Sequence, residues 1–180
     1  MKTTLTTTLL LLSIAATSQI RLEDVRFDAF IYTEPQHYVL SDNRDALIHV
    51  SSADGFNIGA AIEYQSNIFY AKAATYFFPD LKGANYIDLG GSFGINWQSE
   101  MRFWRAYIGF CGARIWRDGD GDYANMGGEA GVDYYFSGWN NGLFVGIQGS
   151  IVSATDSKLW SPNDDTLTRR NLGLKLGFTF

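Results

Sequence analysis

Apolar and polar residues alternate with a period of two along most of this chain. The final stretch shows it best, because residues 172, 174, 176, 178 and 180 are all Leu or Phe and the residues between them are small or polar. Successive side chains of a β-strand point to opposite faces, so this alternation predicts a strand whose faces meet different surroundings. It predicts eight strands in all, at residues 25–32, 56–65, 69–77, 87–97, 104–111, 129–136, 143–151 and 171–180.

The connections between these predicted strands are alternately short and long. Short connections are expected at 65–67, 98–101 and 137–142, and mostly longer, more polar ones at 33–55, 79–84, 118–126 and 155–166. An even number of strands with short turns at one end and long loops at the other is typical of an outer-membrane barrel. The sequence therefore predicts an all-β fold, an eight-stranded antiparallel up-and-down transmembrane β-barrel with periplasmic turns and extracellular loops. Residues 46–52 fit a loop, an extension of the second strand or a separate hairpin arm.

A membrane barrel must close, because lipid offers no partner for an unpaired strand edge. The tryptophans fit this interpretation, since indole rings prefer the level of the lipid headgroups. The tryptophans near the short turns would form one aromatic girdle, made of Trp97, Trp104 and Trp139. Those near the long loops, Trp116 and Trp160, would form the other. The alternative is a soluble barrel of lipocalin type, whose apolar face points inward. Its outer face would be rich in Lys and Glu, whereas the polar face here is mostly Gly, Ser, Asn and Tyr with single charges.

The polar faces of the predicted strands would line the barrel interior. They carry charges of both signs, at Arg26, Asp28, Glu63, Lys72, Asp88, Arg105, Glu129, Asp133 and Lys175. An eight-stranded barrel is just wide enough for side chains to fill it, and buried charges must be paired. We therefore expect a salt-bridged, non-conducting lumen, narrowed further by Phe30, Tyr32, Tyr70, Tyr76, Tyr107 and Tyr135. A narrow pore with an excess of one sign is the alternative.

The first residues have the pattern of an export signal. Lys2 gives a basic start, residues 9–16 form a short apolar run, and Ala16 and Ser18 are small residues at the positions that a signal peptidase recognises. We expect a signal peptide at residues 1–18 with cleavage after Ser18, and the barrel domain at 19–180. Since no cysteine follows the apolar run, a lipoprotein anchor is excluded.

Composition excludes several other classes of protein. The chain of 180 residues has a net charge of −5, which argues against a nucleic-acid-binding face. Its single cysteine cannot form an internal disulfide or a thiolate metal site. We expect no cofactor.

Taken together, the signal peptide and the closing strand resemble the small eight-stranded outer-membrane β-barrel proteins of Gram-negative bacteria. In that family, alternating apolar residues ending in an aromatic form the signal for the barrel-assembly machinery; the matching residues are Leu172, Leu174, Leu176, Phe178 and Phe180. Residues 117–119 and 128–136 resemble poorly characterised barrel proteins of the Bacteroidota type of outer membrane. The resemblance implies contact with outer-membrane lipid and lipopolysaccharide, and transfers no catalytic residue.

Two motifs suggest hydrolytic chemistry. Residues 90–94 match G-x-S-x-G around Ser92, but a nucleophilic serine of that type needs a strand-to-helix turn and none is expected here. His49 and Ser51 share one face of a possible strand and weakly resemble the His-x-Ser pair of outer-membrane lipid A deacylases. The other interpretation is a polar pair at the base of a loop.

A third motif is acidic. Asp118, Asp120 and Asp122 alternate with glycines, and such oxygen clusters suit calcium or a divalent bridge to lipopolysaccharide. Gly-Asp repeats are also ordinary turn material.

These observations favour a non-enzymatic outer-membrane protein that acts structurally or as an accessory subunit of a larger assembly with other outer-membrane proteins. A lipid A-modifying hydrolase that uses His49 and Ser51, and a narrow pore, are the alternatives.

Overall fold

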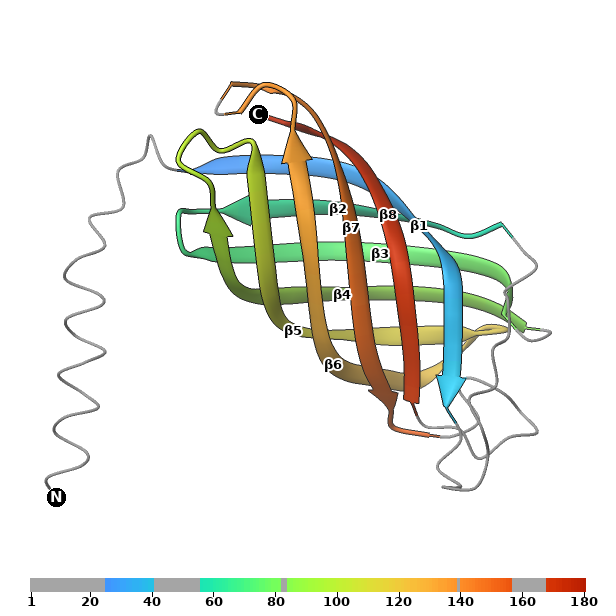
Figure 1. Cartoon of the computed structure of the whole chain (residues 1–180). Coiled ribbons are helices and arrows are strands. Elements are labelled where there is room, and N and C mark those ends of the chain that lie inside the picture. Colours follow the sequence, from blue (N-terminus) through green and yellow to red (C-terminus); the bar gives the residue numbers. More distant parts are fainter. Residues whose placement is uncertain (1–24, 41–55, 82–83, 139, 157–167) are drawn as a thin grey trace, which may run out of the picture.

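Eight antiparallel strands close into a barrel in chain order (Figure 1). The computed structural model describes residues 25–40, 56–81, 84–138, 140–156 and 168–180. The strands are β1 (Arg26–Leu40), β2 (Ile58–Gln65), β3 (Phe69–Leu81), β4 (Ala84–Gln98), β5 (Trp104–Arg117), β6 (Asp120–Tyr135), β7 (Gly142–Ala154) and β8 (Thr168–Thr179). Each pairs with the next along the chain, and β1 closes the sheet against β8. The predicted fold class is confirmed.

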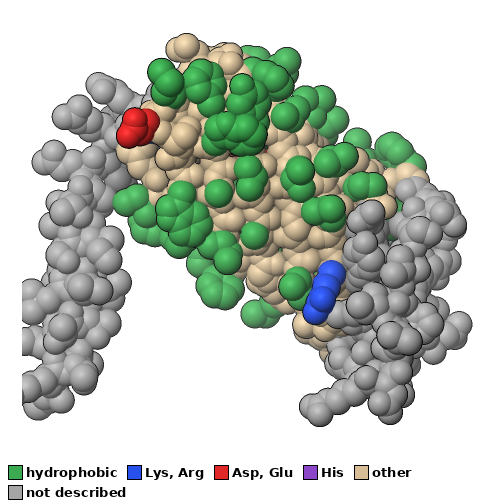
Figure 2. Space-filling view, in the orientation of Figure 1, with side chains coloured by type: hydrophobic (Ala, Val, Ile, Leu, Met, Phe, Trp, Pro, Cys, Tyr) green, Lys and Arg blue, Asp and Glu red, His purple; other side chains and the backbone are tan. Residues whose placement is uncertain are grey.

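The barrel is apolar outside and polar inside. Outward residues such as Phe93 and Phe110 expose more than 60% of their surface, at 64% and 69%, whereas the inward Arg105 and Asp133 expose 1% and 0%. Figure 2 shows hydrophobic side chains spread over the viewed face, with charged ones toward its two ends. This is the reverse of a lipocalin-type barrel, so that alternative is excluded. A surface of this kind is stable only against lipid. Among the described residues, no helix is long and apolar enough to cross a membrane.

The strands extend into three of the predicted loops. β1 continues to Leu40, β3 and β4 approach within two residues of each other, and β6 begins at Asp120. Residues 33–40, most of 79–84 and most of 118–126 are therefore strand, and the prediction of long loops there was wrong. The connection at 118–119 is a two-residue turn, since Asp118 and Gly119 both have positive φ, at 49° and 88°, as a type I′ hairpin requires.

The physical reason for these errors lies in the outward face. Beyond the lipid the outer side of a strand no longer needs apolar residues, so the contrast between the two faces fades while the strand continues. The inward face still holds the pattern, because Phe78, Tyr86 and Ile115 pack in one buried cluster near this end. The Asp, Asn, Pro and Gly residues in these stretches are typical of turns, but the hydrogen-bonded strand pairing continues through them.

A bulge in β1 provides an inward carboxylate. The register with β8 shifts between Thr33 and Gln36, around Pro35, which has no N–H to donate to the ladder. The side chain of Asn57 replaces a strand partner here: its Oδ1 accepts from the backbone N–H of Glu34 at 2.7 Å, and its Nδ2 donates to the Glu34 carbonyl at 3.2 Å. Glu34 is thereby held inside the barrel.

The inside-out polarity predicts opposite costs for one substitution at two outward positions of β7. Ile147 lies in the middle of the apolar stretch and Ser153 near its loop end. Ile147→Arg should lower the free energy of unfolding in phospholipid vesicles by about 2–4 kcal/mol, and Ser153→Arg by about 0–1 kcal/mol. Urea titrations of the two variants measure this. Equal effects would contradict a lipid-facing exterior.

Candidate functional site: the barrel interior

Arg105 on β5 is the centre of a buried ion-pair cluster. Its Nη1 contacts Glu63 on β2 and lies 3.0 Å from Asp133 Oδ2 on β6. The other oxygen of Asp133 lies 2.6 Å from Lys175 Nζ on β8. All four side chains are buried, and an unpaired charge in such a place would cost several kcal/mol. The cluster therefore ties four strands together across the lumen.

A glycine makes the contact between Asp133 and Lys175 possible. Gly146 on β7 lies between them in register, paired with Asp133 on one side and with Lys175 on the other. A Cβ at Gly146 would collide with Asp133 Oδ1 and come within 2.9 Å of Lys175 Cε. The missing side chain lets the two charges meet over β7, although their strands are not neighbours.

Two tyrosines enclose the guanidinium of Arg105. Its carbon lies 4.6 Å from the ring centre of Tyr107 and 5.1 Å from that of Tyr70, within the range of cation–π attraction. The two rings also meet edge to face at 5.1 Å. Little space for water remains around the cluster.

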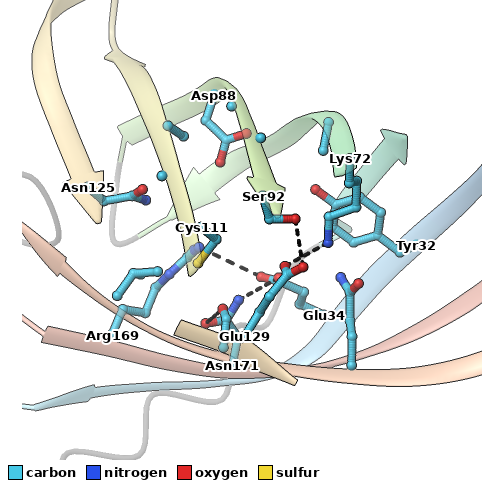
Figure 3. Close-up of a pocket in the computed structure, with 18 of the residues that line it drawn as sticks. Tyr32, Glu34, Lys72, Asp88, Ser92, Cys111, Asn125, Glu129, Arg169 and Asn171 are labelled. Atoms are coloured by element: carbon cyan, nitrogen blue, oxygen red, sulfur yellow. Dashed lines mark hydrogen bonds and ion pairs between the residues drawn. The ribbon is translucent and has the colours of Figure 1, made fainter. Parts of the chain in front are cut away.

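A second cluster forms around Glu129 on β6, seen in Figure 3. The carboxylate lies 2.6 Å from Lys72 Nζ on β3 and accepts hydrogen bonds from Tyr70 at 2.8 Å and Ser92 at 2.6 Å. Ser92 lies within β4, not on a strand-to-helix turn, and its hydroxyl donates to this carboxylate. The G-x-S-x-G match is therefore part of the packed interior.

The turn end of the lumen is closed by a separate group of side chains. Asp28 accepts hydrogen bonds from the Gln65 amide and from the Tyr135 hydroxyl, the latter at 2.7 Å. Arg26 donates to the carbonyl of Gly138 at 3.1 Å and its guanidinium lies 3.7 Å from the centre of the Tyr135 ring. These contacts link β1, β2 and β6 with the connection between β6 and β7.

Sequence reasoning missed two interior charges at the loop end, Glu34 and Arg169. Arg169 Nη2 lies 3.8 Å from Glu34 Oε2, and Asn171 donates to the other oxygen of Glu34. Both charges fell outside the predicted strands, in the supposed loop 33–55 and before the predicted start at 171. Counting in steps of two from Tyr32 and from Asn171 would have placed both side chains inside.

A cavity of about 80 Å³ remains between the Glu129 cluster and the loop end. Asp88, Cys111 and Asn125 are among the polar groups on its wall (Figure 3). It is large enough for a few water molecules. Within the described residues, no group of three or more His, Cys, Asp or Glu side chains is placed to bind a metal ion.

The structure places all nine lumen charges of the sequence analysis inside the barrel. Eight of them contact another polar group of the interior through the hydrogen bonds and ion pairs above: Arg26, Asp28, Glu63, Lys72, Arg105, Glu129, Asp133 and Lys175. The ninth, Asp88, accepts a hydrogen bond from the Tyr86 hydroxyl at 3.1 Å. The six aromatic residues predicted to narrow the lumen are buried there as well.

The remaining candidate residues lie elsewhere or outside the described part. Trp97 and Trp104 are outward and exposed beside the turn between β4 and β5, and Trp116 is half-buried near the opposite end. Leu172, Leu174, Leu176, Phe178 and Phe180 all face outward. Trp139, Trp160, His49 and Ser51 lie outside the described residues.

Of the acidic motif, one side chain is described. Asp118 Oδ1 accepts from the backbone N–H of Asn85 at 2.8 Å, so this carboxylate joins two neighbouring hairpins. The side chains of Asp120 and Asp122 lie outside the described part of the chain.

Comparisons with known proteins support the fold. No protein-family model matches the chain, and no curated protein matches it. Among solved structures, Neisserial surface protein A is similar over 87% of this chain and 96% of its own, with a TM-score of 0.54 and 15% identity. Ail of Yersinia pestis covers the same share of this chain and 97% of its own, at 11% identity and a TM-score of 0.45. The first of these likenesses shows that the chain has the fold of small eight-stranded outer-membrane barrels.

Loss of the central cation should destabilise the barrel strongly. Arg105→Met leaves Glu63 and Asp133 with one cation fewer in a buried site, and breaking a buried pair in this way costs about 3–5 kcal/mol. The double variant Arg105→Met, Glu63→Gln removes the stranded carboxylate while Asp133 keeps its ion pair with Lys175, and it should recover a large part of that loss. Urea unfolding in vesicles measures both. A single variant as stable as the wild type would contradict the role given to this cluster.

Proposed function

We propose that this protein is a non-enzymatic outer-membrane barrel that acts structurally or as an accessory subunit of an outer-membrane assembly. The location is supported by the closed barrel with its apolar exterior, and by the export signal expected at residues 1–18. The closing strand, with Phe180 as its last aromatic residue, fits recognition by the barrel-assembly machinery. Outer-membrane lipid and lipopolysaccharide are then its immediate surroundings.

The observation that carries this proposal is the filled lumen. Arg105, Glu63, Asp133 and Lys175 meet in the middle of the barrel, with Tyr70 and Tyr107 packed against them. An ion would have to separate buried, paired charges to pass, which costs several kcal/mol. With conduction disfavoured, the function lies on the surfaces that the barrel presents.

The long strands support a role in presenting such a surface. A crossing needs about 9–11 residues per strand, whereas β4 has 15 residues and β6 has 16. The hairpins β3–β4 and β5–β6 therefore project beyond the lipid on the loop side as paired strands. Asp118 joins them through Asn85. They form a rigid rim on which a partner protein can dock.

The native size of the untagged protein, extracted gently from the outer membrane, tests the proposal. We expect migration within a particle larger than one 20.1 kDa chain in detergent, with co-migrating outer-membrane proteins. In a planar bilayer the purified protein should give no current steps above baseline. Migration as a lone barrel would contradict the accessory role, and discrete current steps would identify a pore.

A further inference from the structure

The charged side chains of the outer wall have one sign. Among the outward-facing strand side chains that the structure describes, they are Arg114 on β5 and Arg170 on β8, and both are exposed. Ten residues separate Arg114 from Trp104 along the chain, and ten separate Arg170 from Phe180. At about 3.3 Å per residue and a tilt of about 40° this is about 25 Å, the height of a typical apolar band. Both arginines therefore lie at the headgroup level on the loop side.

The guanidinium of Arg114 is held in place by its neighbours. Its Nε donates to the carbonyl oxygen of Gly121 on β6 at 3.0 Å, and its carbon lies 5.5 Å from the centre of the Trp116 ring. Neither terminal nitrogen, Nη1 or Nη2, makes a hydrogen bond or ion pair with the described residues. A guanidinium fixed in this way presents a forked pair of donors, which suits bidentate binding of a phosphate.

A bulge and a glycine make room for this arrangement. The register of β5 and β6 shifts between Ile115 and Arg117, so that residues 121 and 122 of β6 oppose Trp116 alone. A Cβ at Gly121 would collide with the indole ring of Trp116. The missing side chain lets the ring lie against β6, where it supports the guanidinium of Arg114. Arg170 has no such support, since no ring contact, hydrogen bond or ion pair joins it to the described residues.

A shallow hollow of 520 Å³ lies directly beside Arg114, over the seam between β5 and β6. The small residues Gly112 and Ala124 form part of its floor, and Ala124 is the register partner of Arg114. The side chains of Leu89 on β4 and Met126 on β6 border it, and both are exposed. The hollow thus offers a place for a hydrocarbon chain next to a fixed cation.

The side of the membrane identifies the anion that suits this site. The loop side of an outer-membrane barrel is extracellular, so Arg114 faces the outer leaflet. The anionic lipid of that leaflet is lipopolysaccharide, whose lipid A part carries phosphates at the headgroup level and acyl chains in the apolar band. A phosphate monoester carries more negative charge than the diester of a phospholipid, and its oxygens match the forked donors of a guanidinium.

We propose that Arg114 binds a phosphate of one lipopolysaccharide molecule, with an acyl chain of its lipid A in the hollow over Gly112 and Ala124. The inference rests on the proposed outer-membrane location, and it adds a defined site to a surface that lipid covers in any case. Trp116 and Gly121 are positioning residues, because they hold the guanidinium and do not contact the lipid phosphate themselves. Arg170 attracts anionic lipid at the same level without a fixed geometry.

Native mass spectrometry of the detergent-solubilised protein tests this site. Lipid A with its phosphates and the same lipid A after their removal are added in equal amounts, and the molecules retained per barrel are counted. One charge-assisted contact corresponds to about a ten-fold preference, which the wild type should show for the phosphorylated form. Arg114→Gln should remove most of this preference. Trp116→Leu should reduce it to about three-fold, because the guanidinium loses the ring that supports it. Ala124→Leu fills the hollow and should lower retention of both forms.

Matched controls separate this site from general effects on the barrel. Arg170→Gln removes the other outward arginine and should leave most of the preference. Ala106→Leu adds a leucine to the outer wall outside the hollow and should leave retention unchanged. Each variant is first shown to be folded by its different gel migration before and after boiling. A wild type without that difference would overturn the membrane barrel itself.

Three results would overturn the lipopolysaccharide site while leaving the barrel intact. Equal losses of preference in Arg114→Gln and Arg170→Gln would mean that any exposed cation on this wall attracts the lipid. Unchanged retention in Ala124→Leu would remove the acyl chain from the hollow. In a separate arm with phosphatidylglycerol, retention as strong as that of phosphorylated lipid A would mean that the site accepts any anionic lipid.

Discussion

The constraint on which this structure depends is the absence of hydrogen-bond partners in lipid. It forces the sheet to close, so β1 pairs with β8 and no edge remains in the apolar band. Closure in turn fixes which face of every strand contacts lipid and which face contacts the narrow interior. The polar side chains of the inner face must then pair and hydrogen-bond with one another, because eight strands leave almost no room for water. The ion-pair clusters around Arg105 and Glu129 are the consequence of that enclosure.

The interior and the exterior use small residues for opposite purposes. Inside, the absence of a side chain at Gly146 lets Asp133 and Lys175 meet across the intervening strand β7. Outside, Gly128 and Gly149 leave a hollow that larger residues could fill. The first arrangement stabilises the barrel by pairing buried charges. The second is not required by the packing of the barrel, since a Cβ would meet only ordinary contacts at both positions.

The period of two was sufficient to predict the fold and the inward direction of the nine lumen charges. It failed where lipid no longer imposes the contrast between faces, so the ends of β1, β3 and β6 were taken for loops and Glu34 and Arg169 were missed. The pairing itself could not be predicted. Lys72 is the register neighbour of Glu63, yet it pairs with Glu129 across the lumen, while Glu63 pairs with Arg105. These pairings depend on how far each side chain reaches across the closed interior. The alternation of residues along a single strand carries no information about that reach.

The central claim, a closed and filled lumen, is tested most directly by the chain's single cysteine. Cys111 lines the interior cavity of about 80 Å³, which is too small to admit a charged, membrane-impermeant maleimide. The protein folded in phospholipid vesicles should remain unlabelled over hours and become fully labelled after boiling in detergent. Mass spectrometry of the intact chain reads out both states. Labelling of the folded protein at the rate of the boiled protein would mean that the lumen is open to water and would contradict the account.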